Sequence, residues 1–460
     1  MMKSFPRRRK ALAILLLLAL LLPLVSYADK LTAMPEHFVV AHARTDQLLD
    51  EGQRFVVREV LTTQSAAVNN LLTRETDSLE AEMLPQVVPD PKGKAQQNSR
   101  LDMEATYARS GQSALSVLLI GRVTQGRTQV ALGFRSVVAD VRTGQRIALG
   151  NLFPSDSAAW TLLSGRVQEH LTQVFPAQAR DEQAVARLSA PEAVAQAAFT
   201  LGGQELTLHY LAQDIGIALP AMIHVRFYYP EFAGMWSEAG RVHTDNRHFK
   251  MVALTFDDGP VYFNSIYTLT ALRQNGARGT FFQNGMLFEE NAGVLRRQFD
   301  SNHLIASHSF RHKSGYVLSP QGMQDQITKG NDLLLQMVGV PVTLFRAPGG
   351  LWPPWQKQKV GLPIIQWSVD TYDYAQSNKY DVAATVRKYT RHGDIILMHD
   401  SREVNHKAVP LIAQWLTDNG YLMVSVEELA WAEGVTLEPN IVYARFDNGQ
   451  YNERRDSNLN

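Results

Sequence analysis

Two neighbouring carboxylates, Asp257 and Asp258, stand where a predicted strand ends. The apolar residues 251–254 predict a buried strand, and Gly259 with Pro260 predicts the turn that stops it. At such a strand end, one carboxylate can bind a metal ion while the other moves a proton. The same residues also favour a simple turn, because Asp, Gly and Pro are all good turn formers. A catalytic site therefore requires histidines that complete it.

A pair of histidines, His308 and His312, follows another short apolar run. Their spacing places both imidazoles on one side of a helical turn or a wound loop. Alone, such a pair is more often solvated or hydrogen-bonded than metal-bound. Together with Asp258, it would supply three protein ligands and leave a fourth position for water, which is the pattern of catalytic zinc. The chain has no cysteine, so any metal must be held by histidine or carboxylate ligands.

Further polar residues follow other predicted strands. Arg346 precedes a Pro-Gly-Gly turn, where it can orient a carboxylate while a backbone N–H of the turn faces the site. Asp370 and Asp373 follow the apolar run at 364–367, and His399 follows the run at 395–398. Each has a simpler interpretation, as a surface arginine, a turn-forming aspartate or a hydrogen-bonded core histidine. Their common position at strand ends favours a shared site.

Short apolar strands alternate with helical stretches from about residue 249 to 434, which predicts parallel βα units. About seven such units closing on themselves would make a barrel with its site at the carboxyl ends of the strands. The predicted strands are 251–256, 279–283, 304–307, 344–346, 364–367, 395–398 and 422–424, with helices such as 319–338 and 383–391.

The region before this barrel predicts a smaller α+β module without chemistry of its own. Its predicted elements are a strand at 39–47, a helix at 64–79, a hairpin at 114–123 and 129–141, a helix at 155–175, and strands at 199–210 and 224–229. The sequence is thus divided into residues 1–28 as a signal peptide, 29–245 as the α+β domain, 246–435 as the α/β domain, and 436–460 as a polar C-terminal tail.

Composition and the first residues indicate an exported globular protein. The chain has 460 residues, 45% of them hydrophobic, and a formal net charge of zero, so nothing indicates nucleic acid as a partner. A basic start, an apolar stretch at 11–25 and Ser26-Tyr27-Ala28 match a secretory signal. The stretch is short for a membrane span, so an uncleaved membrane anchor is the less favoured alternative. The predicted location is extracellular, cell-wall associated or periplasmic.

In order and position, the polar clusters resemble the five motifs of the polysaccharide deacetylases, the NodB-homology domains of carbohydrate esterase family four. The resemblance covers about residues 249–434, and its most specific parts are Thr-Phe-Asp-Asp-Gly-Pro at 255–260 and His-Ser-x-x-His at 308–312. It implies a distorted (β/α) barrel that removes N-acetyl groups from a polysaccharide with the help of a divalent metal ion, commonly Zn²⁺.

The resemblance also implies a role for each matched residue. It makes Asp257 the catalytic base held by Arg346, and it makes His399 the general acid paired with Asp370. The implied metal ligands are Asp258, His308 and His312. Substrate contacts are implied for the backbone N–H of Gly349, which would stabilise the oxyanion, for Leu397, which would line the acetyl pocket, and for Tyr374. Gly349 replaces a larger residue of the family and Tyr374 replaces a common tryptophan, so both changes bear on substrate choice.

A second resemblance lies in the α+β region. Residues 134–145, followed by Gly-Asn-Leu-Phe at 150–153, are similar to the RsiV-like extracellular domain, which precedes the catalytic domain in some exported peptidoglycan deacetylases. An ordinary hairpin followed by a helix is the alternative. The resulting hypothesis is an exported N-deacetylase of peptidoglycan. Its alternatives are a deacetylase of chitin-like oligomers, poly-N-acetylglucosamine or acetylated xylan, and a catalytically silent wall-binding or sensing protein.

Overall fold

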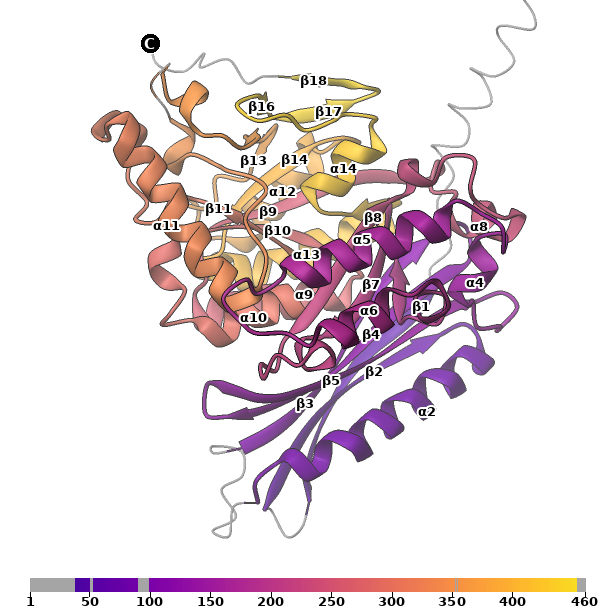
Figure 1. Ribbon diagram of the computed structural model, residues 1–460. Helices are drawn as coiled ribbons and strands as arrows, with labels where there is room; N and C mark the ends of the chain where they lie inside the picture. The colour runs from indigo at the N-terminus through magenta and orange to yellow at the C-terminus, as the bar shows by residue number, and fades with distance from the viewer. Residues whose placement is uncertain (1–37, 50–52, 90–98, 352, 354, 453–460) are drawn as a thin grey trace, which may run out of the picture.

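The computed structural model describes residues 38–49, 53–89, 99–351, 353 and 355–452 (Figure 1). The predicted signal peptide lies outside this part of the chain. No helix among the described residues has the length and apolar character needed to cross a membrane.

A parallel sheet in the C-terminal half has the strand order β11-β10-β9-β14-β13. Its central strand β9 pairs with β10 and β14 over its second half and with β15 over its first half. Beyond β11, single bridges through Phe345 lead to β12, which pairs with β16. This curved arrangement confirms the predicted distorted α/β barrel. The strands are β9 (Lys250–Gly259), β10 (Gly279–Gln283), β11 (Leu304–Ser307), β12 (Ile364–Ile365), β13 (Val369–Asp370), β14 (Ile395–His399), β15 (Tyr421–Met423) and β16 (Val442–Tyr443).

Helices between these strands cover the sheet. α9 (Tyr262–Gln274), α12 (Lys379–Tyr389) and α13 (Glu403–Asp418) enclose one apolar core with β9 and β14. The others are α10 (Ala292–Asp300), α11 (Pro320–Val338) and α14 (Val426–Ala432). Their ends follow the sequence: the Ser319 side chain accepts the Gly322 N–H at the start of α11, and Gly339, with φ of 84°, ends it.

A five-stranded sheet with the order β1-β2-β3-β4-β5 forms the first part of the chain. Its strands are β1 (Val39–Leu49), β2 (Arg54–Thr63), β3 (Ser99–Ser110), β4 (Ala114–Gln125) and β5 (Thr128–Asp140), and α2 (Ala66–Met83) packs along one face (Figure 1). The predicted hairpin is present as β4 and β5. The prediction missed β2 and β3. In β3, charged Asp102 and Glu104 alternate with apolar Leu101 and Met103, and both kinds are buried.

A three-stranded sheet follows, built from β6 (Phe199–Leu201), β7 (Glu205–Leu211) and β8 (Met222–Tyr228). The single strand predicted at 199–210 is a hairpin, because the chain turns at Gly202 and Gly203. α5 (Ala159–Gln173) and α6 (Glu182–Ser189) contribute to the same apolar core. The region predicted as one α+β module thus contains two sheets with separate cores.

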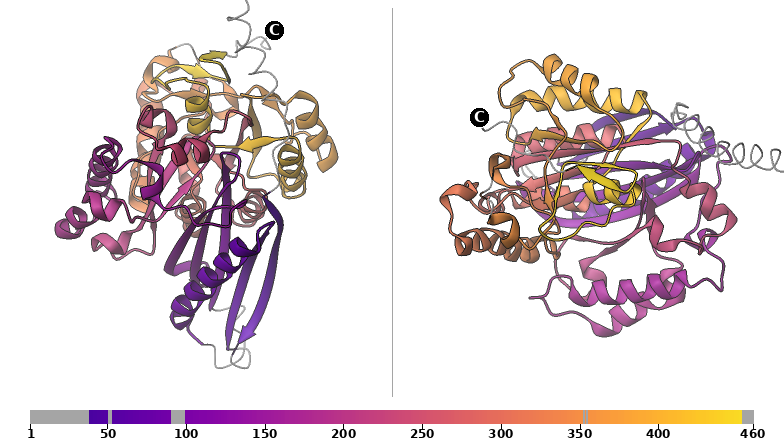
Figure 2. Two further views of the ribbon diagram at one scale, coloured as in Figure 1. Left: turned by 90° about the vertical axis from the view of Figure 1, so that its right-hand side faces the viewer. Right: turned by 90° about the horizontal axis from the view of Figure 1, so that it is seen from above.

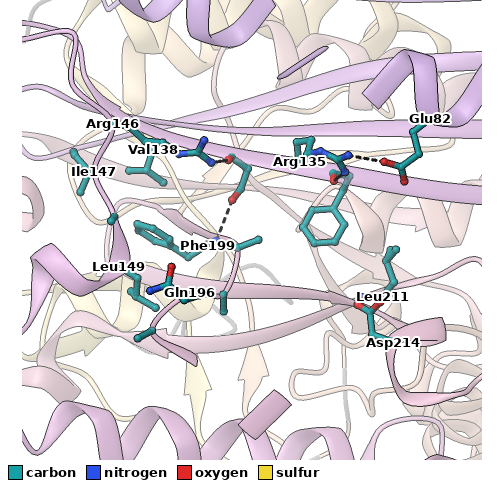
Figure 3. A pocket seen from close by; sticks show the side chains of 16 residues that line it. Glu82, Arg135, Val138, Arg146, Ile147, Leu149, Gln196, Phe199, Leu211 and Asp214 are labelled. Carbon is teal, nitrogen blue, oxygen red and sulfur yellow. Dashed lines mark hydrogen bonds and ion pairs between the residues drawn. The ribbon is translucent and has the colours of Figure 1, made fainter. Parts of the chain in front are cut away.

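A cleft of about 480 Å³ lies between β5 and the loop that precedes β6 (Figure 3). Arg135 and Arg146 line it. Each arginine has an acidic partner on α2: Arg135 pairs with Glu82, and Arg146 lies 3.1 Å from Glu75. Both arginines of the cleft are thus already paired with carboxylates of the protein.

The five-stranded sheet docks on the barrel through buried ion pairs. Arg273 of α9 lies 2.9 Å from Glu59, and Arg297 of α10 lies 2.6 Å from Glu104 and 2.9 Å from Asp102. All five side chains are buried. Charges taken out of water require partners of opposite sign, and the two parts of the chain supply them to each other. Figure 2 shows the resulting close association from two further sides.

The three-stranded sheet also contacts the barrel. Arg278 lies 2.8 Å from Glu205 of β7 and 2.9 Å from Glu428 of α14. The rings of Tyr228 and Trp431 stack with centroids 5.3 Å apart. Both sheets of the first region are therefore fixed to the barrel by specific contacts.

The predicted polar tail at 436–460 is partly wrong. Within the described residues, β16 pairs in parallel with β12, and β17 (Arg445–Asp447) forms a hairpin with β18 (Gln450–Asn452). Tyr443 and Phe446 are buried in the apolar core that also contains β15. The polar composition did not indicate that these strands contribute to the core, because only alternate side chains of such short strands face inward.

Candidate active site

The predicted site residues meet at the carboxyl ends of the parallel strands. Asp257 of β9 and His399 of β14 are direct neighbours across the two strands. His308 follows β11 at the same edge, where its N–H donates to the Gln283 carbonyl at the end of β10. The strand register thus brings together side chains that are far apart in the sequence.

Asp258, His308 and His312 form a three-residue cluster. Asp258 Oδ1 lies 3.6 Å from His308 Nε2 and 3.1 Å from His312 Nε2. One potential ligand atom from each residue lies within 4.8 Å of the others. Asp258 Oδ1 is buried and has no hydrogen-bond partner of ordinary geometry among the described residues. A buried oxygen facing two imidazole nitrogens suits a shared cation better than an ordinary hydrogen bond.

The hydrogen bonding of His308 fixes its tautomer. Its Nδ1 lies 2.9 Å from the backbone oxygen of Arg346, which can only accept, so Nδ1 carries the proton. Nε2 then presents a lone pair toward Asp258. Burial also lowers the pKa of His308, which favours the neutral imidazole that a metal requires. The set of two imidazoles and one carboxylate fits a divalent ion such as zinc.

The backbone around this cluster is strained. Asp258, Ser309, His312 and Tyr372 have φ angles of 72°, 70°, 50° and 55°, in the left-handed region that residues other than glycine rarely adopt. Two of these four residues are the candidate ligands themselves. Strained backbone at a cluster of polar side chains is a common feature of functional sites.

Arg346 is fully buried and holds Asp257 in place. Its Nη1 donates to Asp257 Oδ1 at 2.7 Å and to Thr255 Oγ1 at 2.8 Å. The remaining guanidinium donors reach the backbone oxygens of Ile365 and Gln366. Asp257 is therefore a buried carboxylate with one oxygen fixed by an arginine, while Oδ2 lies 3.7 Å from His308 Nε2 at the cluster. This is the orientation that the resemblance implied for the pair.

His399 pairs with Asp373, and the predicted partner Asp370 was wrong. His399 Nδ1 lies 2.8 Å from Asp373 Oδ1, and its backbone N–H donates to Oδ2 at 2.7 Å. Asp370 lies in β13 and pairs with Leu397 of β14, which is two residues before His399. The Oδ1 of Asp370 accepts the Tyr372 N–H. Tyr372, at positive φ, turns the chain after β13. Asp373 thereby reaches the end of β14, where His399 lies.

Burial opposes the charged form of His399, yet the hydrogen bond from its ring to Asp373 and the nearby carboxylates raise its pKa above the usual value. Since Asp373 occupies Nδ1, the other ring nitrogen is left to donate a proton to a bound molecule. His399 is therefore suited to act as a general acid at near-neutral pH.

The remaining predicted residues lie around these groups. Leu397 is buried two residues before His399 on the same strand, so both side chains point to the same face of the sheet. Tyr374 is 46% exposed, with its ring centroid 5.7 Å from that of His399. Gly349 has φ of 67° and open space where a Cβ would lie. The wall that a larger residue would form at Gly349 is thus absent.

The sequence analysis did not select Asp400, although it directly follows His399. Its backbone N–H donates to the Asp257 carbonyl at 2.7 Å, and its buried carboxyl group accepts from Ser265 Oγ on α9. Burial, together with the nearby negative charge of Asp258, raises the pKa of Asp400 to about 7. This group ties the end of β14 to β9 and α9. The only sequence signal for it is an acidic residue at a strand end.

The sequence model of the polysaccharide deacetylase family matches residues 244–360. Residues 244–360 belong to this family. The matched segment contains Asp257, the three candidate ligands and Arg346, and the predicted enzyme class, a polysaccharide deacetylase hydrolase, is confirmed.

Individual relatives extend the match of the deacetylase domain. The peptidoglycan-N-acetylglucosamine deacetylase PgdA of Listeria monocytogenes is 27% identical over 322 residues, which cover 67% of this chain and 68% of the relative. A bifunctional xylanase/deacetylase of Pseudobutyrivibrio xylanivorans is 30% identical over 208 residues, 45% of this chain and 34% of the relative. Among solved structures, a T48 deacetylase with substrate is 32% identical, covers 42% of this chain and 96% of its own, and has a TM-score of 0.41.

Proposed function

We propose that this protein is an exported, metal-dependent N-deacetylase that acts on peptidoglycan and releases acetate. The observation that carries the proposal is the meeting of three units at one sheet edge: the cluster of Asp258 with two histidines, Asp257 held by Arg346, and His399 held by Asp373. The Listeria relative, named as a peptidoglycan deacetylase, supports the substrate. The leader-like sequence at residues 1–28 supports export.

Asp258, His308 and His312 would hold the divalent ion, for which zinc suits the ligand set. When bound, the ion supplies Lewis-acid polarisation of the acetamide carbonyl and lowers the pKa of a nearby water. A binding protein has no use for such a cluster beside an oriented base and an oriented acid.

The chain's own residues then divide the proton transfers. Asp257 takes a proton from the attacking water, and the Arg346 contact keeps its carboxylate aimed at the site. The backbone N–H of Gly349 stabilises the oxyanion that forms from the carbonyl. His399, protonated through its pairing with Asp373, gives its proton to the sugar nitrogen as the carbon–nitrogen bond breaks. The products are acetate and a free amine.

The direct test measures acetate release from purified peptidoglycan, chitooligosaccharides and acetylated xylan. We expect release from peptidoglycan that stops after chelation and returns with zinc. Asp77→Asn, a change of an exposed aspartate on α2, serves as the control and should leave the rate unchanged. Release only from xylan or chitooligosaccharides would keep the reaction and refute the substrate. No release from any of the three would refute the proposal in favour of a silent wall-binding or sensing protein.

A further inference from the structure

The tip of the β4–β5 hairpin reaches two helices of the deacetylase domain. Residues 125–128 at this tip are exposed. The guanidinium carbon of Arg127 lies 4.5 Å from the ring centroid of Tyr262 at the start of α9. The carbonyl oxygen of Arg127 approaches Gly293 near the start of α10 so closely that a Cβ there would be 2.7 Å away. The tip is therefore seated in a fixed position and does not hang free.

These contacts lie on the face of the barrel that carries the site. α9 follows β9 directly, and α10 follows β10, so both helices begin at the carboxyl ends of their strands. Tyr262 is four residues beyond the candidate ligand Asp258. Since consecutive Cα atoms are 3.8 Å apart, the two residues lie within about 15 Å of each other. The contact therefore lies within reach of a glycan strand that is bound at the site.

The side chains at this contact can recognise an acidic glycan. Within the described part of the chain, no carboxylate lies within ion-pair distance of Arg127. The Tyr262 ring holds its guanidinium by a cation–π contact and leaves its planar donors for another group. Next to it, Phe263 is 64% exposed, with its ring perpendicular to that of Tyr262. An exposed aromatic face can pack against the apolar face of a sugar ring.

We propose that Arg127, Tyr262 and Phe263 form a subsite that binds a carboxylate-bearing part of the glycan substrate next to the reacting sugar. The first region of the chain would thus contribute a specificity-determining residue to the deacetylase domain. The inference rests on the proposed function, because peptidoglycan carries carboxylates on its peptide stems whereas chitooligosaccharides carry none. Arginine binds a carboxylate through two parallel hydrogen bonds, which provides the discrimination.

The test compares Arg127→Gln with the unchanged protein on soluble peptidoglycan fragments and on neutral chitooligosaccharides. We expect the KM for the acidic fragments to rise about tenfold, which is the loss typical of one charged hydrogen-bonded pair. The kcat and both constants for the neutral oligomer should stay unchanged. Arg74→Gln is the matched control, because Arg74 is 73% exposed on α2, a helix on the face of the sheet away from the barrel. Tyr262→Phe should leave the preference for acidic fragments unchanged, because the aromatic ring remains, and Tyr262→Ala should reduce this preference.

A binding measurement separates this inference from the proposed function. Calorimetry with Asp257→Asn, alone and combined with Arg127→Gln, reports binding of the same fragments without turnover. Weaker binding of the double variant to acidic fragments only would support the subsite even if the protein released no acetate. An equal loss of affinity for acidic and neutral ligands, or no loss for either, would overturn the subsite. A thermal unfolding curve of Arg127→Gln identifies an equal loss that is caused by misfolding.

Discussion

Two regions of this molecule bury many charged side chains, and they use them differently. At the interface between the five-stranded sheet and the barrel, Glu104 is 3% exposed and is surrounded by three arginines. At the deacetylase site, Asp258 and the two histidines lie at an opening, where the side chain of His312 is 45% exposed. The interface charges meet one another, whereas the site charges meet at a point that a metal and a substrate can reach. Buried charge marks function only where the partners leave a place open.

The largest expected effect comes from the site. Asp257→Asn removes the base but keeps the shape and one hydrogen-bond acceptor for Arg346. We expect kcat on peptidoglycan to fall by about 10³-fold, with a smaller loss of stability than a broken interface pair causes, because the asparagine oxygen still accepts the hydrogen bond from Arg346. Acetate release and a thermal melt measure the two quantities. A large loss of stability would show that Asp257 belongs with the structural charges, which would break the comparison.

The interface should respond in the opposite way. Arg273→Met leaves Glu59 and Glu104 short of a buried partner. Breaking a buried ion pair on one side costs about 3–5 kcal/mol of folding free energy. Denaturant unfolding should show this loss, while Arg74→Met, on the exposed face of α2, should show almost none. At temperatures where the variant is folded, its kcat should stay close to that of the unchanged protein.

The partner of His399 can be distinguished by a matched pair of variants. Asp373→Asn removes the negative charge that holds His399 and should lower kcat by about 10²-fold. It should also move the alkaline limb of the pH–rate profile to lower pH, because Asp373 raises the pKa of His399. Asp370→Asn should change both much less. A larger effect at Asp370 in the measured profiles would return the role to the residue that the sequence resemblance selected.

The smallest effect concerns two buried histidines between the three-stranded sheet and α10. His224 Nε2 donates to the Phe299 carbonyl, its Nδ1 accepts from His209 Nδ1, and His209 Nε2 accepts from Thr200. This chain holds both rings neutral, and burial lowers the pKa of His209 from 6.5 to about 3.

As the pH falls below about 6.5, the unfolded chain binds these protons first, so stability is highest above this pH and falls toward pH 3. Chemical unfolding at pH 7.5 and 5.0 should show a loss of about 1–2 kcal/mol from His209. His209→Gln should reduce this pH dependence. An unchanged dependence in that variant would show that other groups govern the acid response.

The sequence predicts the site better than the contacts that hold the regions together. The motif residues lie at strand ends, and parallel strands bring those ends to one edge whatever the details of packing. The interface pairs join residues as far apart as Glu59 and Arg273, separated by 214 positions, and nothing local marks either one. β3 escaped prediction for the same reason, because its charged face is buried against the barrel.

The incorrect prediction of Asp370 instead of Asp373 shows another limit of prediction from the sequence. Both carboxylates follow the same apolar run, so strand position alone does not distinguish them. The deciding feature is the left-handed backbone conformation of Tyr372, which a tyrosine in the sequence does not indicate. Local backbone strain is a property of the folded site, which pattern and propensity do not contain.

The four site residues other than glycine at positive φ also limit how far the stability of this enzyme can be raised without loss of activity. Glycine would relieve the backbone strain at any of them, at the expense of a more flexible unfolded chain. Asp258 and His312 cannot be exchanged, because their side chains are candidate ligands. Only Ser309 and Tyr372 are open to such a change, and both lie in loops that aim the working side chains. A variant stabilised at these two positions would therefore gain folding stability but lose alignment of the site side chains.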